Sequence, residues 1–386
     1  MKRLLFVSNG HGEAAIARRI AGELRALLPD AHCDHLALVG DHCGDTLNEV
    51  GPRRAMPSGG LIAMGNARNF ARDLRAGLLG LTWSQAAFLR KARGVYDAAV
   101  AVGDAYALVM TLLAKTPVIF VGSAKSVDVA PYGPFEERIL ARARLRFVRD
   151  GATALALRRH GIDAEAANAI VDLFESPDDP RVEAAVDGFA PALAIFPGSR
   201  ESAYEDARFL LEVTRELAAA RPQLGAVLSI APGLDAARFA AEARNAGWEV
   251  RTAADDALPF VLSHQGREIV RAWRGSIGPL LSRVVLVLGQ AGTANEAAAA
   301  AALPVVAFER ERDRKSRWYR QRQRGLLGDA LAVLPGRLAD AAAGAGAILD
   351  DPVRRRSMGA IGRTRMREAG GARRIAERIV ALLAER

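Results

Sequence analysis

Four short polar segments of this chain each stand between an apolar run and a helix-like segment. They are SNGHGE (8–13), VGDAYAL (102–108), FPGSRES (196–202) and GQAGTANE (289–296). Glycine lets the backbone approach a ligand closely, and the start of a helix offers free N–H groups and a partial positive charge. These strand-to-helix segments, here called corners, suit a phosphate group, although a glycine before a helix is also a common structural cap in α/β proteins.

The two corners in the second half of the chain together predict a diphosphate site. Arg200 can make bidentate contacts to a diphosphate, and Thr293 can cap its helix or donate its hydroxyl group. Glu296 is expected in the first turn of its helix, where its negative charge interacts favourably with the helix dipole, and it can accept hydrogen bonds from sugar hydroxyls. The chain has no GxxxxGK[ST] loop and no GxGxxG after a strand. The expected contacts to a nucleotide-sugar donor are Gly198, Ser199, Arg200, Gly292, Thr293, Asn295 and Glu296.

The elements that must position these corners alternate along the chain. Short apolar runs predict buried strands at 4–7, 95–102, 117–121, 193–196, 226–230, 284–288 and 304–308. Apolar periodicity and the segments between the strands predict helices at 14–28, 106–115, 203–220 and 372–384. Strands that alternate with helices indicate parallel sheets covered on both faces, and ligands bind beyond the carboxyl ends of such strands.

A proline-rich and acidic segment around 168–191 interrupts this alternation, and the strand–helix pattern then restarts. A chain of 386 residues is long enough for two ordinary domains. The sequence therefore predicts an α/β protein with two Rossmann-like domains that face a cleft. Its expected parts are an acceptor domain at 1–172, a linker at 173–191, a donor domain at 192–368 and a C-terminal helix at 369–386.

The motifs resemble those of lipid-A-disaccharide synthase and its related proteins, which are glycosyltransferases with the GT-B architecture. FPGSRES followed by GQAGTANEAAAAAALPVVAF carries most of this resemblance. SNGHGE is similar to the opening corner of that group, particularly of its related-protein branch, and ANAIVDLF is similar to the end of its first domain. VGDAYALVMTLLAK resembles the segment with that family's acidic catalytic residue. More distantly, the layout is similar to the transferase that adds N-acetylglucosamine to lipid intermediate I of peptidoglycan.

The resemblance implies an inverting, metal-independent hexosyltransferase that moves a sugar, expected to be a hexosamine, from a UDP-sugar to a lipid-linked or glycolipid acceptor. It also implies a C-terminal helix that can cross back to the first domain. A base must take the proton of the acceptor hydroxyl, and Asp104 is the first candidate, followed by His11 and Glu13. No cofactor is expected beyond the UDP-sugar, which is the donor substrate.

His11 stands where the synthase has a small hydroxyl residue, and AGTANE is one residue shorter than the synthase pattern. The resemblance therefore supports a sugar transferase more firmly than any particular acceptor.

The formal net charge of +9 and the pI of about 10.1 favour anionic partners. The sequence has no recognised nucleic-acid-binding motif, so nucleic acid is not an expected partner. The two cysteines, Cys33 and Cys43, cannot form a disulfide framework, which favours a reducing compartment. Their neighbours His32, His35 and His42 match no standard zinc spacing, so no metal site is expected.

Two basic stretches add a membrane hypothesis. Residues 65–93 mix arginines with large apolar side chains, a composition that can lie on an anionic bilayer surface. No apolar stretch reaches the roughly 20 residues of a spanning helix, so the expected location is cytoplasmic and peripheral to the inner face of the membrane. The stretch 309–325 is interpreted as a diphosphate clamp, a lipid-headgroup contact or a solvated face. The expected membrane and acceptor contacts are Leu78, Leu79, Trp83, Arg72 and Arg75.

Two alternatives to a transferase remain open at this point. A UDP-sugar 2-epimerase shares the two-domain fold and needs no lipid surface. A non-catalytic protein of the same fold would bind a nucleotide sugar without turning it over.

Overall fold

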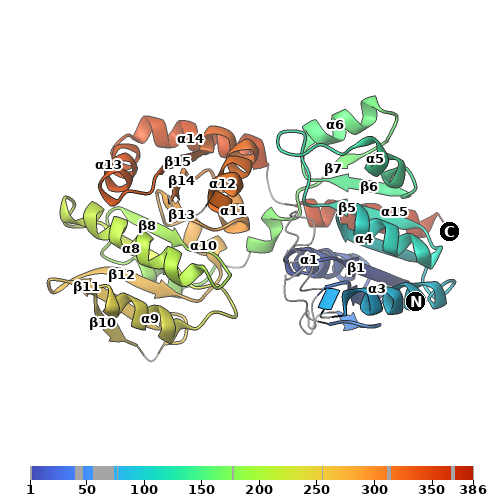
Figure 1. The fold of residues 1–386 in the computed structure, drawn as a ribbon, viewed down its shortest axis with the longest axis horizontal. Coiled ribbons are helices and arrows are strands. Elements are labelled where there is room, and N and C mark those ends of the chain that lie inside the picture. The colour runs from blue at the N-terminus through green and yellow to red at the C-terminus, as the bar shows by residue number, and fades with distance from the viewer. Residues whose placement is uncertain are drawn as a thin grey trace. The chain divides into compact units, whose positions relative to one another are not determined.

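The computed structural model describes residues 2–39, 47–54, 74–75, 77–175, 178–253, 255–310, 314–366 and 370–385. It is an α/β protein that divides into two units (Figure 1). Unit 1 comprises Met1–Leu173 together with Ala369–Arg386, and unit 2 comprises Phe174–Glu368. Each unit has one sheet with its own hydrophobic core, as the sequence predicts for two Rossmann-like domains.

The sheet of unit 1 has the strand order β3-β2-β1-β4-β5-β6-β7. Every pairing in it is parallel, which confirms the expected parallel α/β character of this half. The strands are β1 (Arg3–Ser8), β2 (His32–Ala37), β3 (Asn48–Glu49), β4 (Ala98–Gly103), β5 (Val118–Gly122), β6 (Leu145–Val148) and β7 (Glu165–Ala166).

Alternate side chains of β1 explain why helices cover both faces of this sheet. Leu4 and Phe6 pack in the core that α1 and α15 complete, whereas Leu5 and Val7 pack in a core with α3 and α4. Successive side chains of a strand point to opposite faces, so a strand that is apolar at every position needs helices on both. The helices of unit 1 are α1 (His11–Leu27), α3 (Leu78–Lys91), α4 (Ala105–Thr111), η2 (Leu112–Ala114), α5 (Pro134–Leu140), α6 (Gly151–Arg159) and α15 (Gly371–Ala384).

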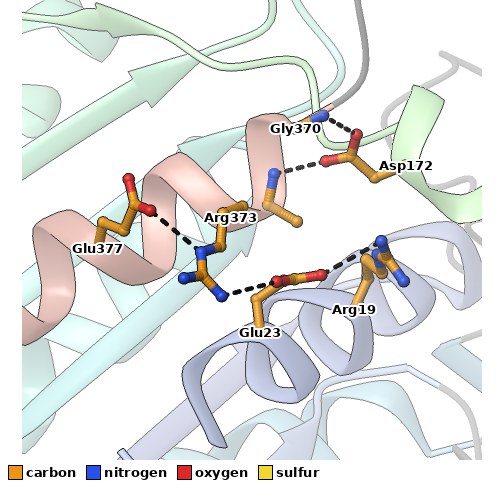
Figure 2. A network of polar contacts seen from close by, with 7 residues as sticks. Arg19, Glu23, Asp172, Gly370, Arg373 and Glu377 are labelled. Carbon is orange, nitrogen blue, oxygen red and sulfur yellow. Dashed lines mark hydrogen bonds and ion pairs between the residues drawn. The ribbon is translucent and has the colours of Figure 1, made fainter. Parts of the chain in front are cut away.

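The C-terminal helix α15 returns to unit 1, as expected, and is fixed there by polar contacts at its start (Figure 2). The Asp172 carboxylate accepts from the backbone N–H groups of Gly370 at 2.6 Å and Ala372 at 2.5 Å. Arg373 forms an ion pair with Glu23 of α1 at 3.7 Å. A carboxylate at a helix N-terminus accepts hydrogen bonds from the free N–H groups and interacts favourably with the helix dipole. Asp172 therefore anchors a segment about 200 residues away in the chain.

The sheet of unit 2 has the strand order β10-β11-β12-β9-β8-β13-β14-β15. The pairings from β12 to β15 are parallel, and those of β10 with β11 and of β11 with β12 are antiparallel. The strands are β8 (Ala192–Phe196), β9 (Gly225–Ser229), β10 (Glu249–Thr252), β11 (Phe260–His264), β12 (Arg267–Trp273), β13 (Val287–Gly289), β14 (Val305–Glu309) and β15 (Leu331–Pro335).

The antiparallel edge corrects the expectation of purely parallel sheets. The turn between β11 and β12 has Gln265 at φ 53° and Gly266 at φ 70°. Two consecutive residues with positive φ match the tight turn whose twist suits a hairpin. The Gln-Gly pair between two β-prone runs is therefore a local signal that the sequence interpretation missed.

The helices of unit 2 surround this sheet, and one of them lies in the segment expected to be a linker. Val182 and Ala185 of α7 are buried, so this short helix is part of the packed unit. The helices of unit 2 are α7 (Arg181–Val186), α8 (Ala203–Ala219), α9 (Ala236–Asn245), α10 (Ile277–Leu281), α11 (Thr293–Ala300), α12 (Arg314–Leu327), η4 (Gly328–Ala330), α13 (Leu338–Leu349) and α14 (Pro352–Met366). The short helix η3 (Val171–Phe174) ends unit 1 and crosses the boundary.

Candidate functional site

Two glycine corners lie side by side at the carboxyl edge of the sheet in unit 2. Gly289, the last residue of β13, pairs in register with Phe196, the last residue of β8. The segments that follow, 197–202 and 290–293, therefore leave neighbouring strands about 4.8 Å apart. Each segment leads into a helix, α8 or α11. The edge thus brings together the two corners from which the sequence predicts donor contacts.

The first corner presents polar side chains to solvent. Gly198 has φ 118° and open space where a Cβ would stand. A side chain there would be strained by the backbone conformation and not by a clash, so the position favours glycine. Ser199 and Arg200 are exposed. Arg200 lies close enough to Tyr319 of α12 to act on the pKa of its phenol.

The second corner differs in detail from the sequence expectation. Gly292 is the N-cap of α11, so Thr293 is the first helical residue and does not cap the helix. Thr293 is exposed, which leaves its hydroxyl free to face a ligand. Glu296 is 8 % exposed in the first turn of the helix. The backbone N–H groups at the start of α11 and the Thr293 hydroxyl are the hydrogen-bond donors of this corner, of the kind that suits a phosphate.

Asn295 lies beneath the corner, although the sequence interpretation placed it among the donor contacts. Its side chain is fully buried. Its Nδ2 donates to Gly289 O at 3.1 Å and to Gln323 Oε1 at 3.3 Å. A Cβ on Gly289 would lie 2.0 Å from Asn295 Oδ1, so glycine at 289 makes room for this amide. Asn295 therefore supports the shape of the corner from inside the protein.

Helix α12 holds the same corner through two buried polar residues that the sequence interpretation missed. Arg320 Nη2 donates to Gln290 O at 2.7 Å, and Gln323 Nε2 donates to Ala291 O at 3.0 Å and to Gly292 O at 3.1 Å. Arg320 is 5 % exposed and Gln323 is 3 % exposed. The only local signal is spacing, since positions 320, 323 and 327 share one helix face and Leu327 is fully buried.

Tyr319 of the same helix reaches the start of α11, where the hydrogen-bond donors of the corner lie. A Cβ on Gly292 would lie 2.4 Å from the Tyr319 hydroxyl, so the phenol rests on this glycine. Burial raises the pKa of the phenol, and the Glu296 carboxylate raises it further, whereas nearby arginines including Arg200 lower it. The basic stretch 309–325 is thus not simply a solvated face. One face of helix α12 packs under the corner at 289–293 and bonds to its backbone carbonyls.

The carboxyl edge of unit 1 gathers the predicted catalytic residues. The register places Ser8 of β1 beside Val102 of β4, so Asn9 and Gly103 are neighbours at the strand ends. A Cβ on Gly103 would lie 2.0 Å from Asn9 Oδ1 and 3.4 Å from Glu13 Cγ. The first corner therefore lies directly against the residue that precedes Asp104. Asn9 was missed at the sequence level because an asparagine in a turn has many structural roles.

Asp104 combines two roles at this edge. It is the N-cap of α4, and its Oδ1 accepts from Tyr106 N at 3.0 Å and Ala107 N at 3.2 Å. Among the residues that the structure describes, Oδ2 accepts no hydrogen bond. The half-buried carboxylate is therefore oriented by the helix through one oxygen and can accept a proton on the other.

Of the other two catalytic candidates, the structure places the side chain of Glu13 close to this position. Glu13 stands in the first turn of α1, and its carboxylate lies over Gly10, where a Cβ would be 2.4 Å from Oε2. The structure thus brings Glu13 into the neighbourhood of Asp104. The backbone of His11 begins α1, but the His11 side chain lies outside what the structure describes.

Helix α3 carries the described part of the predicted membrane surface. Leu79 is 70 % exposed and Trp83 is 75 % exposed, one turn apart on the helix. Leu78 is half-buried and Arg75 is exposed, whereas Arg72 lies outside the described residues. In the part of the chain that the structure describes, no helix is long and apolar enough to span a bilayer.

Metal-ligating side chains do not gather in the described ranges of the chain. Over those ranges, no group of three or more histidine, cysteine, aspartate or glutamate side chains could hold an ion. Cys33 is buried, and burial raises the pKa of its thiol to about 11. His42 and Cys43 lie outside the described residues.

Solved structures with this architecture cover the whole chain at low sequence identity. A protein from Listeria monocytogenes assigned as a UDP-N-acetylglucosamine 2-epimerase has a TM-score of 0.63 at 14 % identity, with 100 % of this chain and 98 % of that chain covered. MurG from Acinetobacter baumannii has a TM-score of 0.59 at 12 % identity, with both chains covered completely. The UDP-N-acetylglucosamine 2-epimerase from Neisseria meningitidis, solved with UDP-N-acetylglucosamine bound, has a TM-score of 0.58 at 12 % identity over the full length of both chains.

No family model and no curated protein sequence matches the chain. The chain has the GT-B fold. This confirms the predicted fold class, with two Rossmann-like units. At these identities the similarity is one of fold, and the narrower resemblance to lipid-A-disaccharide synthase stays a prediction.

Proposed function

We propose that this chain is a glycosyltransferase that moves a sugar from a UDP-sugar to a lipid-linked or glycolipid acceptor. The observation that carries this proposal is the pair of glycine corners on the adjacent strands β8 and β13 of unit 2. Both corners lead into helix N-termini, and one presents the exposed Arg200. That combination suits the diphosphate of a nucleotide sugar, and a structure of the same fold holds UDP-N-acetylglucosamine.

In this proposal, unit 2 stabilises the leaving group. When the bond between the sugar and the diphosphate breaks, negative charge grows on the diphosphate oxygens. The N–H groups at the start of α11, the Thr293 hydroxyl and the Arg200 guanidinium all donate hydrogen bonds. The backbone of the corner at 289–293 is held in place from below by Asn295 and Gln323. A metal ion is not required for this stabilisation.

Unit 1 supplies the base in this proposal. The acceptor hydroxyl oxygen attacks the anomeric carbon of the donor sugar as the bond to the diphosphate breaks. The hydroxyl proton passes to Oδ2 of Asp104, and UDP leaves with the electron pair of the broken bond. Direct attack of this kind inverts the anomeric centre. Glu13, close to the same strand ends, is the second candidate for the proton.

A direct test is a mass-spectrometric assay of the purified chain with UDP-N-acetylglucosamine and a membrane lipid extract. A transferase converts the donor to UDP only when the extract is present, and a lipid gains the mass of one N-acetylhexosamine residue. Absence of both products with a panel of UDP-hexoses and lipid extracts would remove the proposal.

A UDP-sugar 2-epimerase is the second candidate, favoured by the similarity to the Listeria and Neisseria epimerase structures. The same assay separates the two candidates when the lipid extract is omitted. An epimerase converts UDP-N-acetylglucosamine to its 2-epimer without any acceptor, which nuclear magnetic resonance of the sugar protons detects. A transferase leaves the donor unchanged in that sample.

A lipid acceptor requires the protein to reach the bilayer, and α3 provides a suitable surface. Leu79 and Trp83 are exposed on α3, and the exposed basic residues Arg75, Arg90 and Lys91 lie before its start and at its end. Apolar side chains flanked by basic ones bind reversibly to anionic membranes. We therefore infer a peripheral association with the cytoplasmic face of the membrane.

A further inference from the structure

Three polar residues form a row at the carboxyl edge of unit 1. The last residues of β4, β5 and β6 are paired in register, so the residues that follow them stand side by side. Those residues are Asp104, Ser123 and Arg149. With about 4.8 Å between adjacent strands, the row is roughly 10 Å wide. It extends from the proposed base toward β6, away from the corner that carries Asn9 and Glu13.

Two hydroxyl groups at this edge, one in the row and one beside it, are buried and have no hydrogen-bond partner among the residues that the structure describes. They are Ser123 Oγ, on a residue 8 % exposed, and the Tyr132 hydroxyl, on a residue 7 % exposed. A Cβ on Gly122 would lie 2.3 Å from the Tyr132 hydroxyl, so both hydroxyls are at the end of β5. Buried polar groups without partners cost free energy, and proteins retain few of them without a further role.

The charges around these hydroxyls are predominantly negative. Burial raises the pKa of the Tyr132 phenol, and three carboxylates raise it further: Glu136, Asp104 and Asp150. Arg149 lowers it. Three carboxylates act on the phenol from different elements, so an additional anion at this point would be repelled.

The two cations beside the hydroxyls already have partners. Arg149 Nη1 donates to Ser123 O at 3.2 Å. Lys125 lies 5.6 Å from the centre of the Tyr132 ring, and its Nζ is ion-paired with Glu136. Glu136 therefore compensates the charge of Lys125. The two carboxylates of Asp104 and Asp150 outnumber the single guanidinium of Arg149, so this point does not favour a phosphate. A neutral hydroxyl group, in contrast, can both donate to the carboxylates and bond to the two free hydroxyls.

We infer that the ends of β4, β5 and β6 bind a neutral, hydroxyl-bearing ring of the acceptor, and that Ser123 and Tyr132 determine its selection. The inference rests on the proposed glycosyl transfer, because it names the part of the acceptor that unit 1 holds. Asp104 takes the proton of the hydroxyl that reacts, and the two unpartnered hydroxyls bind hydroxyls that do not react. Both hydroxyls are almost without exposed surface, and Lys125 lies over the Tyr132 ring. The inference therefore requires the segment 124–131, which carries Lys125, to move when the sugar ring of the acceptor binds.

The test uses two probes that differ by one phosphate group, N-acetylglucosamine and N-acetylglucosamine 6-phosphate. Saturation-transfer nuclear magnetic resonance measures their binding to the full chain in the presence of UDP. We expect the neutral sugar to bind more tightly than its phosphate. Ser123→Ala and Tyr132→Phe should each weaken binding of the neutral sugar at least about fivefold, the effect of losing one hydrogen bond. Ser84→Ala, which removes an exposed hydroxyl on α3, should leave it unchanged.

Thermal unfolding of Tyr132→Phe distinguishes ligand recognition from a structural role. The hydroxyl has no partner in the described part of the free protein, so its removal should leave the Tm unchanged or raise it. A lower Tm with unchanged sugar binding would show that the hydroxyl serves only the fold, and the inference would be wrong. Hydrogen exchange of residues 124–131 that does not respond to the neutral sugar would also contradict it.

Three further outcomes overturn the inference: no binding of the neutral sugar, tighter binding of its 6-phosphate, or binding that neither variant affects. Calorimetry of UDP on the same samples keeps this result separate from the proposed function. If UDP binds and the sugar does not, the acceptor inference alone is wrong. If the wild-type chain binds no UDP, the proposed transferase itself is wrong.

Discussion

Arg200 is exposed on the turn after β8, where its guanidinium can reach a diphosphate without first breaking an ion pair to another described residue. Arg200→Ala should weaken UDP binding by about 1.5–3 kcal/mol, the range for a charged hydrogen bond. Arg208→Ala is the matched control, since Arg208 is an exposed arginine on the following helix α8. Isothermal calorimetry checks both variants. Equal UDP affinity of Arg200→Ala and wild type would exclude the diphosphate role.

The variant Asp104→Asn tests the role of Asp104, because it keeps a side chain that can cap the helix and removes the basic carboxylate. Turnover should fall at least about a hundredfold while UDP affinity holds. Asp235→Asn is the control, because Asp235 is also an N-cap aspartate, on α9 in unit 2. If turnover survives in Asp104→Asn and Glu13→Gln abolishes it, the base is Glu13.

Helix α12 contributes to the candidate site as a whole element, because it holds a corner made by other segments. Gln323→Leu keeps the side-chain size and leaves the carbonyls of Ala291 and Gly292 without their donor. A lost buried hydrogen bond costs about 1–3 kcal/mol of stability, and the loosened corner should also bind UDP more weakly. Gln321→Leu, on the exposed face of the same helix, is the control. Urea unfolding and calorimetry measure the two effects, and equal behaviour of the two variants would refute this role.

The exposed face of α3 should carry the membrane contact. The double variant Leu79→Ser with Trp83→Ser should bind anionic vesicles at least about tenfold more weakly, since each buried apolar side chain contributes roughly 1.5–3 kcal/mol. Vesicle sedimentation at low and high salt measures this, and wild-type binding should fall as salt screens the basic residues. Val353→Ser removes an exposed apolar side chain from α14 and should have no effect. Wild-type protein that does not sediment at low salt would favour a soluble acceptor or the epimerase.

The stability of the whole molecule should depend on pH through a buried histidine in unit 1. Burial, together with the nearby charges of Arg18 and Arg53, lowers the pKa of His35 to about 4. The unfolded chain has a histidine pKa near 6.5, so it binds more protons between the two values. Stability is therefore full above about pH 6.5 and falls as the pH drops toward 4, by up to about 3 kcal/mol. Urea unfolding of wild type and His35→Gln at pH 7 and pH 4.5 checks this, and the variant should lack that share of the acid sensitivity.

Local sequence was sufficient for the strands and helices that carry the corners. The apolar run of β8, the glycine at 198 and the helix that follows are signals within about ten residues of one another. The same holds for β4 and Asp104. The hairpin of β11 and β12 was missed although its Gln-Gly turn is also local, because the turn alone does not say that the flanking runs pair.

By itself the sequence determined which residues occupy the strand ends, because strand, glycine turn and helix start are encoded by neighbouring residues. It determined neither which polar side chains face a ligand nor which support the fold. Asn295 and Thr293 are two residues apart, yet one is buried under the corner and the other is exposed. Arg320 and Gln323 belong to a basic stretch typical of a solvated surface, yet they bond to carbonyls about 30 residues away. These roles depend on the tertiary structure, because burial and hydrogen-bond partners come from segments that meet only when the sheet and its helices assemble.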